Sequence, residues 1–181
     1  MLAFFLRHFK RTGSHDLREH AEVLSQEKLL EYAILQVDNS YDAELILSKA
    51  MQSVTRAYYE GKIQKSLLTY TLSTIKHEAT KARIKNDNRI IAEQRYWQEN
   101  EIQHDAARND SGQELEDIHF YLRRAIRELD DELSAIIYLH IWNELNFLSI
   151  SKHLHIPEAT VRNRYDNAII ELRTKLRTLH E

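Results

Sequence analysis

The stretch "LHIPEATVRNRYDNAIIEL", from Leu154 to Leu172, contains the single proline of the chain and two arginines two positions apart. Proline has no backbone N–H and a φ fixed near the helical value, so it suits the first turn of a helix. The apolar residues that follow recur at helical spacing, and they are Val161, Tyr165, Ala168, Ile169, Leu172 and Leu176. The stretch therefore predicts a helix that starts at Pro157 and buries one face.

A shorter helix is expected immediately before this one. It covers Phe147 to Leu154, with Asn146 as its N-cap and Ser149 three residues further on. His155 and Ile156 then form a tight turn into the longer helix. A short helix, a tight turn and a longer helix with one apolar face form a helix-turn-helix.

The second helix of such a motif places its first turns in the major groove of DNA. Arginine pairs bidentately with guanine, asparagine pairs with adenine, and either side chain can hold a phosphate. The residues predicted to bind DNA here are Lys152, Glu158, Thr160, Arg162, Asn163 and Arg164. A helical bundle whose polar face is merely solvated fits the same periodicity, so spacing alone does not decide between the two.

The composition favours an all-α protein. The chain has 181 residues, of which 43% are hydrophobic, so it can fill the core of one or two small domains. Three glycines and one proline are too few for the many turns of a β-sandwich or barrel, whereas Leu, Ala, Glu, Lys, Gln and Arg favour helices.

Breaks in the apolar periodicity divide the chain into two small helical domains joined by a polar linker. The first domain contains about three helices, separated at "DNSYD" (Asp38 to Asp42) and at Gly61. Some helix is also expected in the linker, around Ile90 to Ile102. The predicted divisions are an N-terminal extension over 1–16, a helical domain over 17–85, a linker over 86–114 and a helix-turn-helix domain over 115–181.

Charge and cysteine content restrict the function classes. The formal net charge is −3, so there is no overall basic field and any contact with DNA must be local. The absence of cysteine excludes disulfides and thiol chemistry and fits a cytoplasmic location. The apolar run from Leu2 to Leu6 is too short to span a membrane.

No catalytic residue, metal ligand or cofactor is predicted. "HEATK" at His77 has Lys81 where a zinc protease needs its second histidine, and the chain has no glycine-rich phosphate-binding loop. The paired acids Asp130 and Asp131 precede a predicted helix and are explained by capping. The sequence therefore argues against an enzyme.

The segment "LNFLSISKHLHIPEATVRNRYDNAIIELR", from Leu145 to Arg173, resembles the C-terminal promoter-reading region of bacterial RNA polymerase sigma factors. The family pattern is "LSxxEIAxxLGxSxGTVxSRxxRAxxxLR". The matching positions include Ile150, Leu154, Thr160, Val161, Arg164, Ala168 and Leu172. His155 stands where the family has glycine, and histidine visits the left-handed region more often than most residues.

"DAELILSKAMQSVTRAYYEG", which begins at Asp42, resembles the helix by which sigma factors dock on the polymerase. The residues that this resemblance assigns to polymerase binding are Asp42, Glu44, Leu45, Ser48 and Lys49.

"TLSTIKHEATKARIK", which begins at Thr71, resembles the sigma segment that contacts and melts the downstream promoter element. Thr71 stands in place of the usual tryptophan. The residues that the resemblance assigns to DNA here are Lys76, Lys81, Arg83 and Lys85, and the neighbouring aromatic side chains are Tyr58, Tyr59 and Tyr70.

Together these segments resemble a small sigma factor of the extracytoplasmic-function type, which is sigma-70-like and belongs to group IV. The resemblance implies that 17–85 corresponds to sigma region 2 and 115–181 to sigma region 4. The partners it implies are the RNA polymerase core enzyme, promoter DNA and, where one exists, an anti-sigma factor. Two alternatives stay open: a LuxR-like helix-turn-helix regulator that binds free DNA, and an adaptor that retains only protein contacts.

Overall fold

The computed structural model describes residues 25–37, 40–64, 66–99 and 114–180. Within them the chain forms seven α-helices and no strand, which confirms the predicted all-α class. The helices are α3 (Gln26–Gln36), α4 (Ser40–Tyr59), α5 (Leu67–Glu99), α6 (Glu114–Glu128), α7 (Asp131–Ile141), α8 (Phe147–Leu154) and α9 (Glu158–His180). The predicted extension over 1–16 lies outside the described residues. No helix in the described ranges is both long and apolar enough to cross a membrane.

Helices α3, α4 and α5 are the three helices predicted for the first half of the chain, and they pack on one another. The break at Gly61 is confirmed, because its φ of 65° ends α4 in the left-handed conformation that glycine tolerates best. The N–H of Lys62 then donates to the carbonyl of Ala57 at 2.9 Å, as in a Schellman cap.

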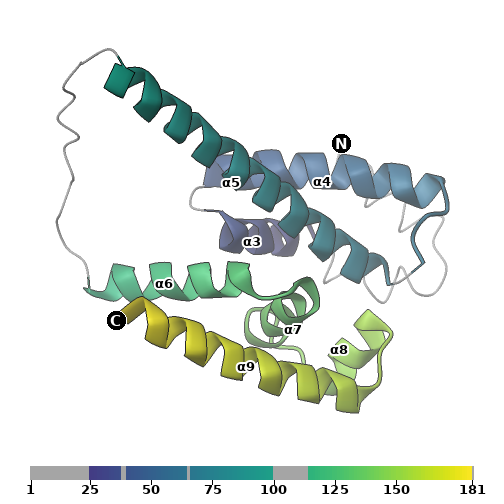
Figure 1. Cartoon of the computed structure of the whole chain (residues 1–181). Coiled ribbons are helices and arrows are strands. Elements are labelled where there is room, and N and C mark those ends of the chain that lie inside the picture. The colour runs from purple at the N-terminus through teal and green to yellow at the C-terminus, as the bar shows by residue number, and fades with distance from the viewer. Residues whose placement is uncertain (1–24, 38–39, 65, 100–113, 181) are drawn as a thin grey trace.

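Helix α5 continues well past position 86, where the linker was predicted to begin. Its C-terminal part projects beyond the other helices (Figure 1). Ile84, Ile90 and Ile91 lie on this part and are 41 to 55% exposed. An exposed helix has no stripe of buried apolar residues, so its sequence resembles that of a polar linker. The prediction of some helix near Ile90 is confirmed. The remainder of the predicted linker, 100–113, lies outside the described residues.

Helix α7 lies between α5 and α9, next to the end of α6 (Figure 1). One side of α7 packs with α6 and α9 through Leu133 and Ile137. The other side belongs to a larger cluster that contains residues of α3, α4 and α5 as well as Ile136 and Leu139. Every residue of α7 from Ser134 to Leu139 is therefore buried, and the two halves of the chain share one core.

Polar bonds also join the two halves, and in most of them the acceptor is a backbone carbonyl. Burial raises the pKa of both Tyr32 and Tyr138, whose rings lie 4.8 Å apart, so their hydroxyls stay protonated and can donate. The bonds are Tyr138 Oη to the Lys28 carbonyl, Tyr32 Oη with Ser134 Oγ (3.3 Å), Arg127 Nε to the Leu35 carbonyl (3.0 Å) and Ser66 Oγ to the His153 carbonyl (2.5 Å).

We predict that Ile136→Ala lowers the free energy of unfolding by about 2–5 kcal/mol, because its fully buried side chain leaves a cavity in the shared core. Urea denaturation followed by circular dichroism measures the change. Ile170→Ala is the matched control: Ile170 is 61% exposed, and its loss is expected to change stability by less than about 0.5 kcal/mol. Equal effects of the two substitutions would contradict the shared core.

Candidate nucleic-acid interface

The predicted helix-turn-helix is formed by α8, the residues 155–157 and α9. The Oδ1 of Asn146 accepts the N–H of Ser149 at 2.9 Å, which confirms the predicted N-cap. His155 adopts the left-handed conformation, with φ 56° and ψ 42°, where the sigma pattern has glycine. The carbonyl of Pro157 accepts the N–H of Val161, so α9 begins at Glu158, one residue after the expected start.

An aromatic cluster at the base of the motif fixes the angle between its two helices. The ring of His140 stacks on Phe147 with centroids 4.7 Å apart and meets the edge of Tyr165 at 4.9 Å. Phe147 and Tyr165 lie 5.2 Å apart. The Nδ1 of His140 lies 2.8 Å from the carbonyl of Leu145, which orients the ring. This role of His140 is not predictable from the sequence, because the residue comes from a different helix and its spacing matches no motif.

Arg162 lies on the exposed side of α9, at the start of the helix. Its Nη2 donates to Glu158 Oε1 at 3.0 Å, and its guanidinium lies 4.9 Å from the centre of the Phe147 ring. An exposed ion pair between positions i and i+4 is worth only about 0.3–0.5 kcal/mol. A phosphate or a base edge can therefore compete for this guanidinium at small cost.

Arg164 faces the body of the protein. Its Nη1 lies 2.6 Å from Glu132 Oε2, and about a third of each side chain is exposed. This pair joins α9 to the first turn of α7.

The other residues predicted to face DNA here lie at the surface: Lys152 and Asn163 are exposed, and Thr160 and Glu158 are half-buried.

Lys76, which was predicted to contact DNA, is buried in this structure. It is 6% exposed, its Nζ donates to the carbonyl of Leu129, and Asp131 Oδ1 lies 3.7 Å away. Burial lowers the pKa of Lys76, while Asp131 and Asp130 oppose that shift. The sequence does not indicate this burial, because α7 comes from a distant part of the chain and covers this side of α5.

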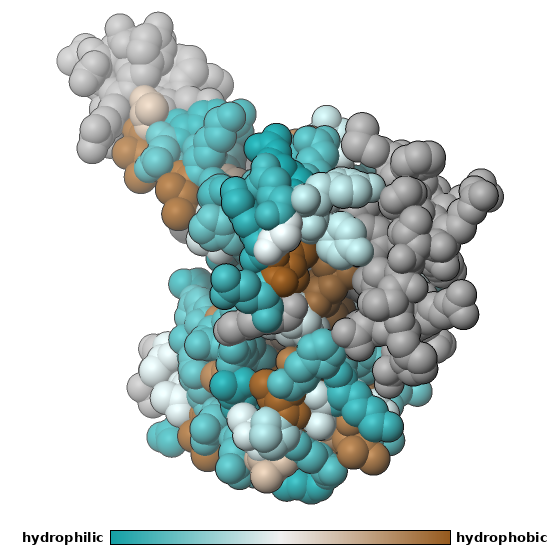
Figure 2. All heavy atoms as spheres, turned by 90° about the vertical axis from the view of Figure 1, so that its right-hand side faces the viewer, coloured by the Kyte–Doolittle hydropathy of each residue, from teal (hydrophilic) through white to brown (hydrophobic). Residues whose placement is uncertain are grey.

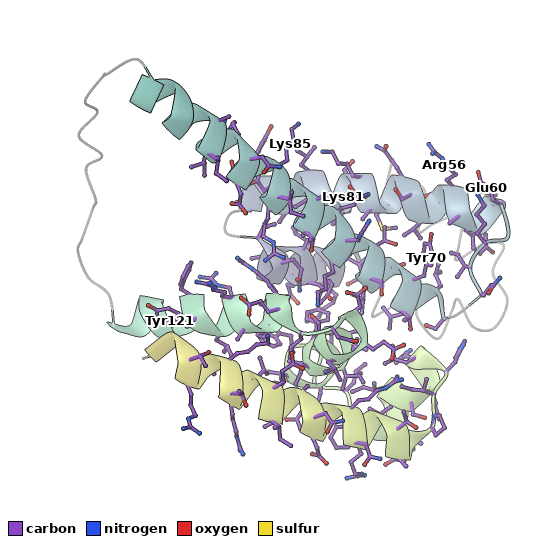
Figure 3. The ribbon with its side chains drawn as sticks, in the orientation of Figure 1. Arg56, Glu60, Tyr70, Lys81, Lys85 and Tyr121 are labelled. Carbon is purple, nitrogen blue, oxygen red and sulfur yellow. The ribbon has the colours of Figure 1, made fainter. Side chains whose placement is uncertain are left out.

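The other basic residues predicted on α5 lie nearer its projecting end. Lys81 and Lys85 are exposed, and Figure 3 shows Lys85 on the side of α5 away from the C-terminal helices. Arg83 is half-buried and donates to Thr80 Oγ1 at 3.3 Å. Tyr70 lies near the start of α5, well separated from these cations (Figure 3). The structure therefore does not bring all the predicted DNA contacts of α5 onto one patch.

The residues predicted to bind polymerase lie together on the outer side of α4. All of them are exposed, and they are Asp42, Glu44, Leu45, Ser48 and Lys49. The residues between them, Ala43, Ile46 and Leu47, point into the core. Leu45 is 45% exposed, which gives this otherwise polar surface an apolar centre.

On the face that Figure 2 shows, most of the coloured surface is hydrophilic, and apolar side chains form small separate patches, one of them near the middle of the molecule. Within the described residues, no group of three or more His, Asp or Glu side chains is placed to hold a metal ion. The predicted DNA face of α8 and α9 carries guanidinium, ammonium and amide groups, which can bind phosphates and base edges.

Residues 119–172 match the family model of sigma-70, region 4. This match covers less than half of the chain, and it includes α7, α8 and most of α9. Among curated proteins no sequence matches the chain. A solved structure that aligns with it is the sigma factor RpoE in complex with the anti-sigma factor NepR from Bartonella quintana, at 14% identity over 88% of this chain and 95% of that chain, with a TM-score of 0.43. The family match confirms the sigma-70-like identification for the helix-turn-helix domain.

We predict that Phe147→Leu lowers the free energy of unfolding by about 1–2 kcal/mol, because it removes two aromatic contacts and the cation–π contact with Arg162. Urea denaturation of Phe147→Leu, Tyr165→Leu and the double variant forms a cycle, in which a coupling of about 0.5–1.5 kcal/mol is expected. Leu148→Ala, at a neighbouring position that is 53% exposed, serves as the control. Strict additivity in the cycle would show that the rings do not fix the motif.

Proposed function

We propose that this protein is a sigma factor of the extracytoplasmic-function type, which directs the RNA polymerase core enzyme to specific promoters. The observation that carries the proposal is the sigma-70 region 4 match over 119–172, on a helix-turn-helix whose second helix presents Arg162 and Asn163 to solvent. Sigma-70 family proteins act without catalysing a reaction of their own, and we assign no catalytic residue.

Each half of the chain is proposed to contact a different promoter element. The first turns of α9, with Lys152 of α8, read the upstream promoter element through base edges and phosphates. Helices α3 to α5 form the region-2-like part, in which Lys81, Arg83 and Lys85 contact the downstream element. The outer side of α4 binds the core enzyme. The segment between α5 and α6 connects the two promoter-reading parts.

The proposed partners are the polymerase core and promoter DNA in the cytoplasm, with an anti-sigma factor as a further partner. The net charge of −3 agrees with DNA binding that depends on the polymerase, since free protein with this charge gains little from the phosphate backbone.

The test of the proposal is a pull-down of the purified chain with RNA polymerase core, in the presence and absence of a known sigma factor. Binding that is close to one to one and that the known sigma factor displaces supports the proposal. Absence of core binding, together with specific binding of free DNA fragments, would instead identify a helix-turn-helix regulator and overturn it.

We predict that Leu45→Asp weakens core binding by about tenfold or more, equivalent to about 1.4 kcal/mol, because it places a charge at the apolar centre of the α4 surface. Fluorescence anisotropy with labelled protein measures the affinity. Ile170→Asp introduces the same charge on α9 at a position that is 61% exposed, and it should leave core affinity unchanged. Equal losses in both variants would contradict the assignment of this surface.

We predict that Arg162→Ala weakens promoter binding by the holoenzyme by about 1–3 kcal/mol if the guanidinium pairs with a base, since that is the value of one bidentate contact. If Arg162 holds only a phosphate, the slope of the logarithm of the binding constant against the logarithm of the salt concentration falls by about one unit instead. This change is then the same for every DNA sequence. Arg164→Ala is measured alongside, and because Arg164 is paired with Glu132 we expect part of its effect as a loss of stability. Unchanged binding and transcription in both variants would show that the DNA face lies elsewhere.

A further inference from the structure

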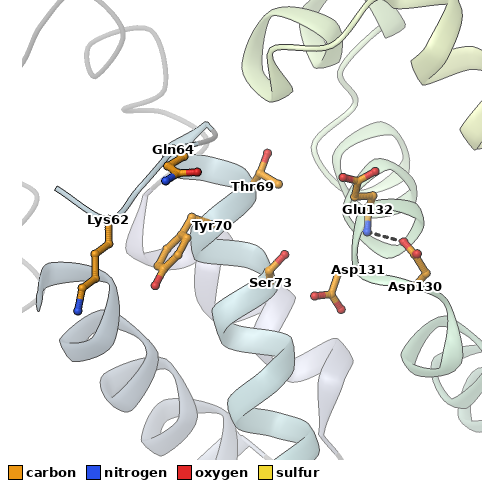
Figure 4. Close-up of a pocket in the computed structure, with 8 residues that line it drawn as sticks. All are labelled: Lys62, Gln64, Thr69, Tyr70, Ser73, Asp130, Asp131 and Glu132. Carbon is orange, nitrogen blue, oxygen red and sulfur yellow. Dashed lines mark hydrogen bonds between the residues drawn. The ribbon is translucent and has the colours of Figure 1, made fainter. Parts of the chain in front are cut away.

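A cavity of about 380 Å³ lies where the start of α5, the first half of α7 and the turn between α8 and α9 meet. This volume is within the range of about 300–1,000 Å³ that is usual for ligand pockets. A cleft of about 610 Å³ adjoins the cavity and shares Gln64, Thr69 and Glu132 with it. Figure 4 shows that cleft, with Gln64 and Thr69 on one side and Glu132 on the other. The turn of the helix-turn-helix thus borders a space large enough for a small molecule.

The lining of this cavity combines an apolar wall with one pair of opposite charges. The apolar wall consists of Ala135, Leu154 and Ile156, and the charges belong to Arg164 and Glu132. The Nη1 of Arg164 lies 2.6 Å from the Oε2 of Glu132, and about a third of each side chain is exposed. A guanidinium has five N–H donors and a carboxylate has about four acceptor positions. These two groups can therefore bind each other and a ligand at the same time.

Thr69 adds a buried hydroxyl group to the lining of the cavity. Among the described residues, its Oγ1 has no hydrogen-bond partner. Further along α5, the hydroxyls of Thr71, Thr74 and Thr80 each donate to the backbone carbonyl four residues earlier, at 2.7 to 3.0 Å. A buried polar atom without a hydrogen bond is unfavourable, and most such atoms in proteins have a partner. A ligand in the cavity would supply the bond that Thr69 lacks.

The two charges determine which kind of ligand fits. A ligand with a single charge is repelled by one member of the Arg164–Glu132 pair. An α-amino acid carries its carboxylate and its ammonium group on the same carbon atom, so it can present each group to the residue of opposite charge. Charge-assisted hydrogen bonds of this kind are among the stronger ones. The side chain of the amino acid would then lie against the apolar wall, which favours an aliphatic or aromatic one.

We propose that this cavity binds an apolar α-amino acid, with its carboxylate on Arg164, its ammonium group on Glu132 and a hydrogen bond to the hydroxyl of Thr69. Binding of the amino acid does not depend on the proposed function. Its consequence for transcription rests on the proposed function, because Arg164 is one of the residues expected to contact the promoter. A bound amino acid holds Arg164 beside α7, so it lowers the affinity of the holoenzyme for the promoter.

Isothermal titration calorimetry of the full chain tests the binding, with L-valine, L-leucine, L-methionine and L-phenylalanine as probes. Saturable binding of at least one of them, close to one molecule per chain, is expected. Isocaproate lacks the ammonium group of leucine and isoamylamine lacks its carboxylate, and each should bind at least about tenfold more weakly than leucine. Absence of saturable binding by all the amino acids, or equal binding of leucine and isocaproate, overturns the proposal.

Substitutions locate the bound amino acid. Thr69→Val removes the hydroxyl at almost constant size and should weaken binding by about fivefold. Thr71→Val is the matched control on the same helix: the hydroxyl of Thr71 bonds to the Leu67 carbonyl, and its loss should leave the affinity unchanged. Arg164→Gln should weaken binding by at least about tenfold, whereas Arg173→Gln, at an exposed position of α9, should not.

Circular dichroism of every variant checks that the helices are retained. Because Thr69→Val exchanges a threonine for a valine of nearly the same shape, it tests the site even if Arg164→Gln does not fold. Equal affinities of Thr69→Val and Thr71→Val for the amino acid overturn the site.

Promoter binding by the holoenzyme, measured with and without the amino acid, tests the consequence. A fall in affinity of about fivefold on adding the amino acid supports the competition for Arg164. An unchanged affinity overturns that competition. If the chain does not bind the core enzyme, the proposed function fails, and the cavity is then judged by calorimetry alone, which requires neither polymerase nor DNA.

Discussion

The burial of α7 on both sides is the constraint on which the rest of the structure depends. One side of this helix completes the core with α6 and α9, and the other side completes the core with α3, α4 and α5. Asp130 starts the helix by accepting the N–H groups of Glu132 and Leu133. Because buried apolar surface is the main stabilising contribution in a chain of this size, neither half can lose α7 without losing much of its core.

The same helix determines the geometry of the DNA-reading motif. His140, in its last turn, supplies one of the three rings that hold α8 against α9, and Glu132, in its first turn, pairs with Arg164. The left-handed residue His155 then turns the chain sharply enough for the two helices to meet. That conformation costs a non-glycine residue about 1–2 kcal/mol, which the packing of Ile150, Leu154 and Val161 offsets.

The features that depend on neighbouring residues were predictable from the sequence. The bounds of α8, the cap at Asn146 and the break at Gly61 are local, since side-chain capping and backbone freedom act within a few positions. The buried Lys76 and the Arg164–Glu132 pair were not predictable in this way. Each joins segments more than 30 positions apart, and the periodicity of a single helix does not show which other helix will cover a given face.

The pairing of the arginines on α9 is compatible with the proposed DNA surface on a chain of negative net charge. Arg162 is shared between Glu158 and the Phe147 ring, so it stays oriented while its ion pair remains exposed and weak. A phosphate that replaces Glu158 therefore meets a guanidinium that is already positioned, and little side-chain entropy is lost on binding. Arg164 differs because its carboxylate partner is on another helix and only a third of it is exposed. If Arg164 moved toward DNA, Glu132 would lose this partner. The contribution of Arg164 to holding α9 on α7 therefore competes with any contribution to DNA binding.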